Sequence, residues 1–213
     1  MSDQKLVTVV DYGMGNLRSV AKAAEHVADA NTRILVSDKP EDIQSADAII
    51  FPGQGAAKAC MQALNQTGMV HALQQAAKEK PFLGICMGLQ VLMTHSQEND
   101  GVDCLNILPG EVRQFDLSGH PQLKMPHMGW NQIHQTVEHA LWHQIPQDSR
   151  FYFVHSYYIV PQDPSIVAGE TTHGTTFTSA IASDNLFAIQ AHPEKSAEAG
   201  LQLFKNFLAW NGQ

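Results

Sequence analysis

The sequence contains little of what defines several large classes of protein. Only three of its 213 residues are cysteines, and Cys60, Cys86 and Cys104 match neither a metal-binding spacing nor a disulfide framework. Lysine and arginine number 13 against 21 aspartates and glutamates, a net charge of −8, and no basic run occurs. The apolar run at residues 6–10 is too short for a signal peptide or a membrane span. We therefore expect a cytoplasmic protein with free thiols, with no nucleic-acid partner and no membrane partner.

The chain also lacks linkers, repeats and low-complexity segments, so residues 1–213 are predicted to form one domain. In the first half, apolar β-branched runs alternate with helical patterns, which predicts a parallel, doubly wound α/β sheet. A helix is expected after Asn16, its N-cap, and a longer helical pattern up to about residue 80 breaks near Gly68. Strands are expected at residues 6–10, 32–36 and 48–51, and immediately before Cys86.

The second half, from about residue 110, is dominated by short strand-like runs and closes with a helical pattern at residues 199–210. An antiparallel layer beside the parallel sheet is therefore predicted. In doubly wound sheets, binding sites lie at the carboxyl ends of the parallel strands, where the turns after Val10, Phe51 and Ile85 are expected. The strand-like runs are residues 111–115, 131–135, 150–154, 157–160, 166–171, 177–183 and 186–190.

One of these turns has the pattern of a nucleophile elbow. Residues 84–88 read Gly-Ile-Cys-Met-Gly, where an apolar run passes through a sharp turn into a helical pattern. The two glycines leave room for a strained backbone at Cys86, so we expect this side chain to be exposed rather than buried. At the start of a helix, the dipole favours a thiolate, and the N–H of Met87 can face an oxyanion. The alternative for this motif alone is a structural cysteine packed between glycines.

A base and a carboxylate follow the last predicted strand. Residues 192–194 read His-Pro-Glu, and Pro193 disfavours helical geometry at His192, so the tripeptide is expected to be extended. His192 and Glu194 would then project to the same side, and the carboxylate could orient the imidazole that activates Cys86. A His-x-Glu pair alone is more often a surface pair, but together with the elbow it predicts a Cys-His-Glu triad.

Two further groups of residues have simple interpretations when taken alone. The glycine-rich turn at residues 52–56 (Pro-Gly-Gln-Gly-Ala) could supply a second backbone N–H for an oxyanion, although an ordinary strand-to-helix turn is the simpler interpretation. His134, His139 and His143 suggest a metal site because the last two are predicted to share a helical face. No carboxylate completes a ligand set there, so we expect no metal.

Three segments resemble the class I, or triad, glutamine amidotransferase family in their order and spacing. They are residues 52–55 (Pro-Gly-Gln-Gly), 84–90 (Gly-Ile-Cys-Met-Gly-Leu-Gln) and 192–194 (His-Pro-Glu). The resemblance covers essentially the whole chain and implies a flavodoxin-like α/β core. It departs from the family pattern at Gln54, where an apolar residue is frequent, and the segments 96–106 and 116–124 match no signature of the family.

Other stretches resemble, more narrowly, the glutamine amidotransferase subunits of imidazole glycerol phosphate synthases, in histidine biosynthesis. These stretches are residues 11–19, 126–131 and 153–157. The resemblance implies a heterodimer with a separate partner chain, the cyclase or synthase subunit, which uses ammonia to make imidazole glycerol phosphate and the aminoimidazole carboxamide ribotide. The residues expected to face that partner are Trp130, Asn131, Tyr152 and Lys195.

The resemblance also implies roles for the site residues, without any cofactor. Cys86 would attack the side-chain amide of glutamine, His192 would pass a proton to the leaving ammonia, and Glu194 would hold His192. Backbone N–H groups would stabilise the oxyanion, from the residues Gly53, Gln54, Gly55 and Met87. The glutamine pocket would be lined by Gln90, His155, Ser156 and Tyr157.

Three alternatives remain open. A non-catalytic α/β module with a redox-sensing cysteine would explain Cys86 but would leave His192 and Glu194 without a role. An α/β-hydrolase would need its acid between the nucleophile and the histidine in the chain, whereas Glu194 follows His192. An amidotransferase subunit of pyridoxal phosphate or purine synthesis would share the triad, and residues 129–131 (Gly-Trp-Asn) favour the histidine-pathway subunit over it.

Overall fold

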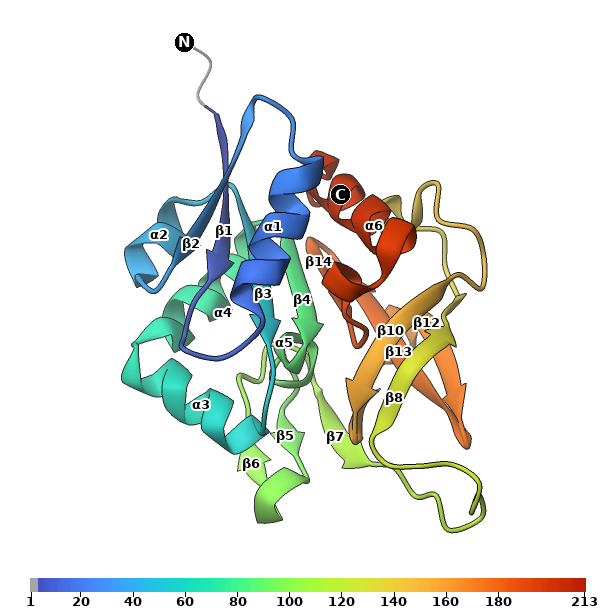
Figure 1. Ribbon diagram of the computed structural model, residues 1–213. Coiled ribbons are helices and arrows are strands. Elements are labelled where there is room, and N and C mark those ends of the chain that lie inside the picture. Colours follow the sequence, from blue (N-terminus) through green and yellow to red (C-terminus); the bar gives the residue numbers. More distant parts are fainter. Residues whose placement is uncertain (1–3) are drawn as a thin grey trace.

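The computed structural model describes residues 4–213. The predicted alternation of strands and helices in the first half is confirmed. Five parallel strands form one half of the central sheet (Figure 1). Their order is β2 (Thr32–Ser37), β1 (Lys5–Val10), β3 (Ala48–Gly53), β4 (Phe82–Cys86) and β14 (Leu186–Ile189).

Helices cover both faces of this parallel half. On one face lie α1 (Leu17–Val27) and α6 (Ala197–Ala209), and on the other α2 (Pro40–Ser45), α3 (Ala57–Gln66) and α4 (Met69–Glu79) (Figure 1). Strand β3 explains why two layers are needed, because its side chains alternate between two apolar cores. Ala48 and Ile50 pack toward α1 and α6, whereas Ile49 and Phe51 pack toward α2, α3 and α4. A strand buried on both faces reads as a continuous apolar run in the sequence.

The second half of the chain continues the same sheet with mostly antiparallel strands, as predicted. In order from β14 these are β13 (Thr175–Ser183), β11 (Tyr157–Pro161), β7 (Gly110–Gln114), β5 (His95–Ser96) and β6 (Val102–Asp103). Two strands pair beside this path, β12 (Val167–His173) and β9 (His134–Gln135). A separate two-stranded antiparallel sheet consists of β8 (His127–Gln132) and β10 (Arg150–His155).

Short helical turns complete the structure. The four-residue helix α5 (Met87–Gln90) follows β4 directly. Single 3₁₀ turns are η1 (Glu98–Asp100), η2 (Ala140–Trp142), η3 (Pro164–Ile166) and η4 (Pro193–Lys195). None of the helices between residues 4 and 213 is long and apolar enough to cross a membrane.

Asn16 is the N-cap residue of α1, as predicted, although its side chain makes no capping hydrogen bond. One local prediction is wrong. The strand expected at residues 131–135 is split, because β8 pairs with β10 whereas β9 pairs with β12 in the central sheet. Ile133 lies at the change of partner, buried, with its N–H donating to Ser149 O at 3.0 Å. The break near Gly68 is confirmed, since this glycine has a positive φ of 69° between α3 and α4.

The carboxyl ends of β1, β3, β4 and β14 meet at one edge of the sheet. The turns that follow them contribute Gly13, Gln54, Cys86 and His192 to one cavity. The fold therefore gathers the predicted site residues at the edge where doubly wound sheets bind ligands.

Candidate active site

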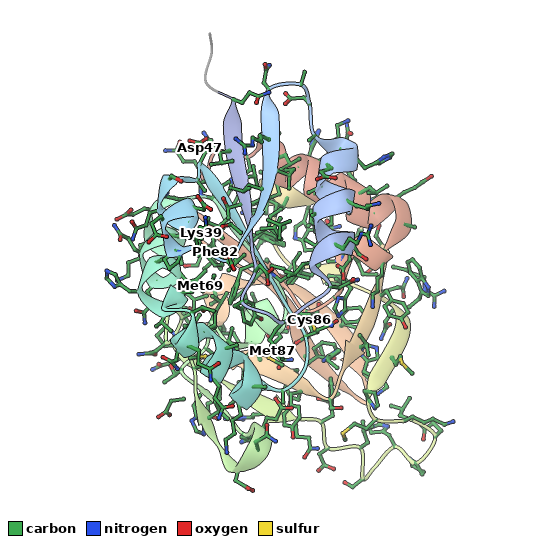
Figure 2. All side chains as sticks on the ribbon, turned by 60° about the vertical axis from the view of Figure 1, so that its left-hand side comes forward. Lys39, Asp47, Met69, Phe82, Cys86 and Met87 are labelled. Carbon is green, nitrogen blue, oxygen red and sulfur yellow. The ribbon has the colours of Figure 1, made fainter. Side chains whose placement is uncertain are left out.

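Cys86 lies at the sharp turn between β4 and α5, in a strained backbone conformation, as the elbow pattern predicts. Its backbone angles are φ 55° and ψ −109°, an unusual conformation for a residue with a side chain. A Cβ added at Gly88 would overlap the carbonyl oxygen of Phe51, and one at Gly84 would lie 2.9 Å from Cβ of Ala188. The predicted steric need for both glycines is therefore confirmed. Figure 2 shows Phe82 and Cys86 at opposite ends of β4, with Met87 beside the cysteine.

The expectation that Cys86 is exposed is wrong, because its exposure is only 6%. The segment after β14 covers it: Gln190 and His192, buried themselves, both approach the thiol. The side chain nonetheless lines a cavity of about 680 Å³ at the carboxyl edge of the sheet. Cys86 therefore faces this cavity although it is buried.

His192 and Glu194 make the contact that the sequence predicts. Their Nδ1 and Oε1 atoms are 2.8 Å apart, and both side chains are buried, with exposures of 4% and 1%. The local backbone differs from the prediction: His192 is extended, but Pro193 begins the 3₁₀ turn η4, closed by Lys195 N–H donating to His192 O at 3.0 Å. Proline is favoured at this first helical position because it has no N–H to leave unpaired.

The charge state of His192 depends on its two neighbours. Burial lowers the pKa of its imidazole, but the thiolate charge and hydrogen bonding of Cys86, followed by the hydrogen bond and charge of Glu194, outweigh burial and raise that pKa to about 10. The second ring nitrogen, Nε2, is buried and has no hydrogen-bond partner among residues 4–213. The imidazole is therefore oriented through Nδ1, while Nε2 remains available on the side of Cys86.

Ser196 fixes the backbone beneath this imidazole. Its buried hydroxyl donates to His192 O at 2.6 Å and accepts from the N–H of Tyr152 at 2.9 Å. The N–H of His192 in turn donates to Tyr152 O at 2.8 Å. Strand β10 thereby holds the turn that carries the base.

The glycine-rich loop lines the same cavity as the imidazole. Gly53 pairs in register with Cys86, and Gln54 and Gly55 are exposed and line the cavity with Met87. A Cβ on Gly53 would overlap the hydroxyl of Tyr12, so only glycine fits there. Cys60, a free thiol like the other two cysteines, lies beneath the loop, and its Sγ is 3.6 Å from Gln54 O.

All four residues expected in the glutamine pocket line the same cavity: Gln90, His155, Ser156 and Tyr157. Gln90 is buried, its Nε2 donates to Tyr157 O at 2.9 Å, and its Oε1 has no partner among the described residues. His155 offers no free ring nitrogen, because Nδ1 donates to Tyr157 O at 2.8 Å and Nε2 lies 2.9 Å from His127 Nδ1. Burial lowers the pKa of His155 to about 3, so this ring is neutral.

The sequence predicts no role for several residues at or behind the site, among them Glu98, His127 and Gln190. Glu98 lines the cavity and accepts from the N–H of Ala57 at 2.7 Å, at the start of α3. His127 is buried behind His155, and Gln190 lies behind Cys86. Glu98 falls in the segment that matched no family signature. His127 falls in the stretch 126–131 that carries the resemblance, but no role is predicted for it. Its Nε2 lies 3.1 Å from Asn131 Nδ2, at the same-side spacing of a strand.

Three of the four residues expected to face a partner are grouped beside the cavity. Trp130 and Tyr152 are paired across β8 and β10, with ring centroids 6.2 Å apart, and Trp130 is 47% exposed. Lys195 lines the cavity and places Nζ 5.8 Å from the centroid of the Tyr152 ring. Asn131 points the other way and donates to Thr172 O at 2.9 Å.

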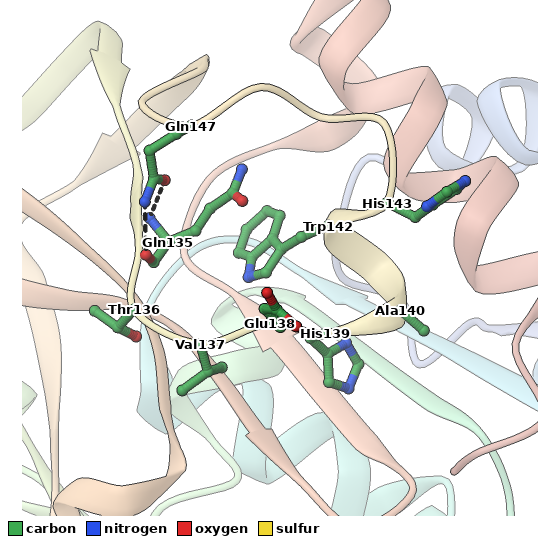
Figure 3. Close-up of a pocket in the computed structure, with 9 residues that line it drawn as sticks. All are labelled: Gln135, Thr136, Val137, Glu138, His139, Ala140, Trp142, His143 and Gln147. Atoms are coloured by element: carbon green, nitrogen blue, oxygen red, sulfur yellow. Dashed lines mark hydrogen bonds between the residues drawn. The ribbon is translucent and has the colours of Figure 1, made fainter.

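A second hollow lies away from these residues, along the segment 135–147 (Figure 3). Several of its polar groups pair within the protein: Gln135 and Gln147 bond reciprocally at 2.8 Å, and Trp142 Nε1 donates to Ala168 O at 3.0 Å. The predicted shared helical face of His139 and His143 is wrong, because only residues 140–142 are helical, and Figure 3 shows the two rings pointing in different directions. No group of three metal-ligating side chains occurs among residues 4–213.

Comparisons with known proteins agree with this geometry. The family model described as glutamine amidotransferase class-I matches residues 8–210. The chain is 81% identical over 213 residues to a protein of Hydrogenovibrio crunogenus named imidazole glycerol phosphate synthase subunit HisH, with 100% of both chains covered. It is 56% identical over 206 residues to the protein of the same name from Nitrosococcus oceani, covering 97% of this chain and 98% of that one.

Solved structures share the fold at much lower identity. The crystal structure of a glutamine amidotransferase superposes with a TM-score of 0.70 at 14% identity, covering 95% of this chain and 99% of that one. The structure of PurLQS from Thermotoga maritima gives a TM-score of 0.68 at 18% identity, covering 97% and 98%. At such identities the likeness extends to the fold alone, and it matches the α/β class predicted from the sequence.

Proposed function

Because the chain belongs to the class I glutamine amidotransferase family, we propose that Cys86, His192 and Glu194 are its catalytic triad. It is a glutaminase subunit of imidazole glycerol phosphate synthase in histidine biosynthesis, as its identity to named subunits over the full chain indicates. The observation that carries the triad is the buried contact of 2.8 Å between His192 Nδ1 and Glu194 Oε1, next to Cys86. A buried imidazole held through one nitrogen presents the other to the nucleophile.

The reaction follows from this arrangement. The Cys86 thiolate forms a bond to the side-chain amide carbon of glutamine, and the C–N bond then breaks as His192 gives a proton to the departing ammonia. The product is a γ-glutamyl thioester. Water then attacks the thioester carbon while His192 accepts its proton, glutamate leaves, and Cys86 is regenerated. Glu194 stabilises the charged imidazole in both steps and fixes its orientation.

We assign the oxyanion to backbone N–H groups on two sides of Cys86. The N–H of Met87, at the first residue of α5, lies at the positive end of the helix, and the loop of Gly53, Gln54 and Gly55 flanks the same cavity. A side chain at Gly53 would overlap Tyr12, so the close approach of this loop to the elbow depends on glycine.

Glutamine would occupy the cavity with its amide at Cys86. Gln90 Oε1, a buried acceptor without a partner among residues 4–213, suits the α-ammonium group of the substrate. Ser156 and Tyr157 line the cavity beside it. His155 contributes the shape of its ring and not a hydrogen bond, since both of its nitrogens are already engaged.

The relatives are named as subunits, and we propose that this chain forms a heterodimer with a synthase subunit in the cytoplasm. The expected contact surface contains Trp130, Tyr152 and Lys195, with Asn131 at its inner side. An exposed tryptophan beside the cavity that releases ammonia is a suitable anchor for the chain that consumes it.

Cys86→Ala tests the proposal in the complex with the synthase subunit from the same organism. Glutamine-dependent turnover should fall to background, while turnover with ammonium salts should stay at the parental rate, because the synthase reaction needs only ammonia. Cys104→Ala, a half-buried free thiol away from the cavity, is the matched control and should retain both activities. Glutamine-dependent turnover that survives in Cys86→Ala would exclude Cys86 as the nucleophile.

A further inference from the structure

Gln190 directly follows strand β14 and is completely buried behind the nucleophile. Its Nε2 atom lies 3.7 Å from Cys86 Sγ, and its Oε1 accepts from Gln90 Nε2 at 2.9 Å. Its backbone N–H donates to Ser179 O at 2.8 Å, which ties the residue to β13. Gln190 does not line the cavity, so it contacts the sulfur from the protein side, and the substrate would approach from the other.

The orientation of the Gln190 amide follows from the backbone carbonyl of Tyr157, because a carbonyl can only accept hydrogen bonds. Tyr157 O faces Gln90, so the Gln90 group at 2.9 Å from it must be the NH₂ group. The same NH₂ group faces Gln190, so the Gln190 atom that meets it must be the oxygen. The remaining end of the Gln190 amide, its NH₂ group, therefore points at Cys86 Sγ.

We propose that Gln190 is a positioning residue for the nucleophile. Its N–H group donates to the sulfur of Cys86, which favours the thiolate and holds Sγ on the side of His192. A hydrogen bond to an ionised group stabilises that group more than its neutral form, and the effect is strong in a buried site. This inference rests on the proposed role of Cys86, but the contact itself can be tested without glutamine.

The test compares the alkylation of the three free thiols by iodoacetamide in the full-length chain, with each site followed by peptide mass spectrometry. Gln190→Met removes the donor with an unbranched side chain of similar size. Gln190→Glu keeps the oxygen that accepts from Gln90 but, when ionised, offers Cys86 no donor. Gln74→Met is the matched control, because the Gln74 amide donates to Leu105 O, away from the cavity.

In both Gln190 variants, Cys86 should react about tenfold more slowly than in the parent at neutral pH, the effect of losing one hydrogen bond to a charged group. Cys60 and Cys104, whose thiol pKa values burial raises to about 11 and about 12, should stay slow in every variant and report on the integrity of the fold. If Cys60 becomes reactive in Gln190→Met, the fold of that variant is disturbed. The alkylation rate of Cys86 in Gln190→Glu then tests the proposal. Unchanged alkylation of Cys86 in a folded Gln190 variant would overturn the proposal.

A kinetic measurement separates this result from a failure of the proposed function. In the complex with the synthase subunit, Gln190→Glu should lower kcat with glutamine about tenfold, with KM and ammonia-dependent turnover unchanged. If alkylation of Cys86 is slower but kcat does not change, the contact between Gln190 and Cys86 is supported. The same result would argue against Cys86 as the nucleophile. A rise in KM alone would assign Gln190 to the support of Gln90 and overturn its role at the sulfur.

Discussion

Two regions of the molecule build the site by different means: the elbow between β4 and α5, and the segment after β14, which β10 holds. In the parallel half, the position of Cys86 is set by absent side chains: Gly53, Gly84 and Gly88 lie where a Cβ would meet a neighbour. In the segment after β14, position is set by hydrogen bonds between buried polar groups, such as that between His192 and Glu194. Steric packing thus positions the nucleophile Cys86, whereas hydrogen bonds position the base His192.

This difference implies different vulnerabilities. A site shaped by close backbone approach tolerates no added volume, whereas a site shaped by buried hydrogen bonds tolerates no lost donor or acceptor. Added methyl groups should therefore be severe around the elbow. Isosteric changes that remove only a charge or a hydroxyl should be severe around the base.

The largest effect is expected for Gly88→Ala. The new methyl group would overlap the carbonyl oxygen of Phe51, a backbone atom of β3 that cannot rotate away, so α5 must shift and carry Cys86 with it. We expect a loss of about 3 kcal/mol in the free energy of unfolding, from urea denaturation, together with background glutamine turnover. The control is Gly119→Ala, an exposed position with open space around its Cβ, where the change should stay below about 0.5 kcal/mol. Equal effects at both positions would remove the steric argument.

The next largest effect is expected for Glu194→Gln, which keeps the shape of the side chain and removes its charge. Glutamine-dependent kcat should fall about 10²- to 10⁴-fold, because the charged imidazole loses its partner in a buried site. The pKa of His192, about 10 in the parent, should fall, as an NMR titration of the imidazole would report. Glu111→Gln, in an exposed ion pair with Arg113, is the control and should change neither quantity. An unaltered His192 titration would show that Glu194 does not hold the base.

A smaller effect is expected for Ser196→Ala. The substitution leaves the buried N–H of Tyr152 and the carbonyl of His192 each without one partner, which should cost about 1–3 kcal/mol of stability. Glutamine turnover should fall with it, because the turn carrying His192 loses its link to β10. Ser45→Ala, whose exposed hydroxyl lies 3.5 Å from Asp42 O, should be neutral by thermal denaturation. Full activity in Ser196→Ala would mean that β10 does not position the base.

The effect that is smallest at neutral pH concerns His127 and His155, because it appears only in acid. Burial lowers the pKa of His127 to about 4 and that of His155 to about 3, from an unfolded value of 6.5. Below 6.5 the unfolded chain binds protons that the folded chain does not, so stability falls as pH falls, by up to about 1.4 kcal/mol per pH unit for each ring. The rings face His173 and the phenyl rings of Phe115, Phe153 and Phe177.

His127→Phe should make this loss of stability shallower. Urea denaturation at a series of acidic pH values gives the slope for the variant and for the parent, and above pH 6.5 the two slopes should coincide. A slope in acid that does not change in His127→Phe would show that this ring is charged in the folded protein or does not contribute.

The sequence predicts most of the parallel half and the triad, because each signal there is local. An apolar run, a glycine two residues from a cysteine, and a His-Pro-Glu tripeptide are each legible within a short stretch of chain. The contacts that were missed join distant parts of the chain: Gln190 and Cys86 are 104 residues apart, and His127 and His155 are 28 apart. No periodicity or spacing reports such pairs.

The errors have the same origin. Exposure of Cys86 was inferred from its own turn, but the segment that follows β14 buries it. The single strand expected at residues 131–135 has an unbroken pattern in the sequence, and it splits because two different strands pair with its ends. Both outcomes depend on which segments become neighbours in the fold.

The central claim, that the elbow and the segment after β14 converge on Cys86 as a nucleophile, is tested most directly by trapping the acyl-enzyme. The complex with the synthase subunit is mixed with glutamine, quenched in acid during the first turnover, and digested for mass spectrometry. We predict a γ-glutamyl group on the peptide that contains Cys86, with none on Cys60 or Cys104 and none in Cys86→Ala. Glutamine turnover without an adduct on Cys86, or with the adduct on another cysteine, would contradict the account.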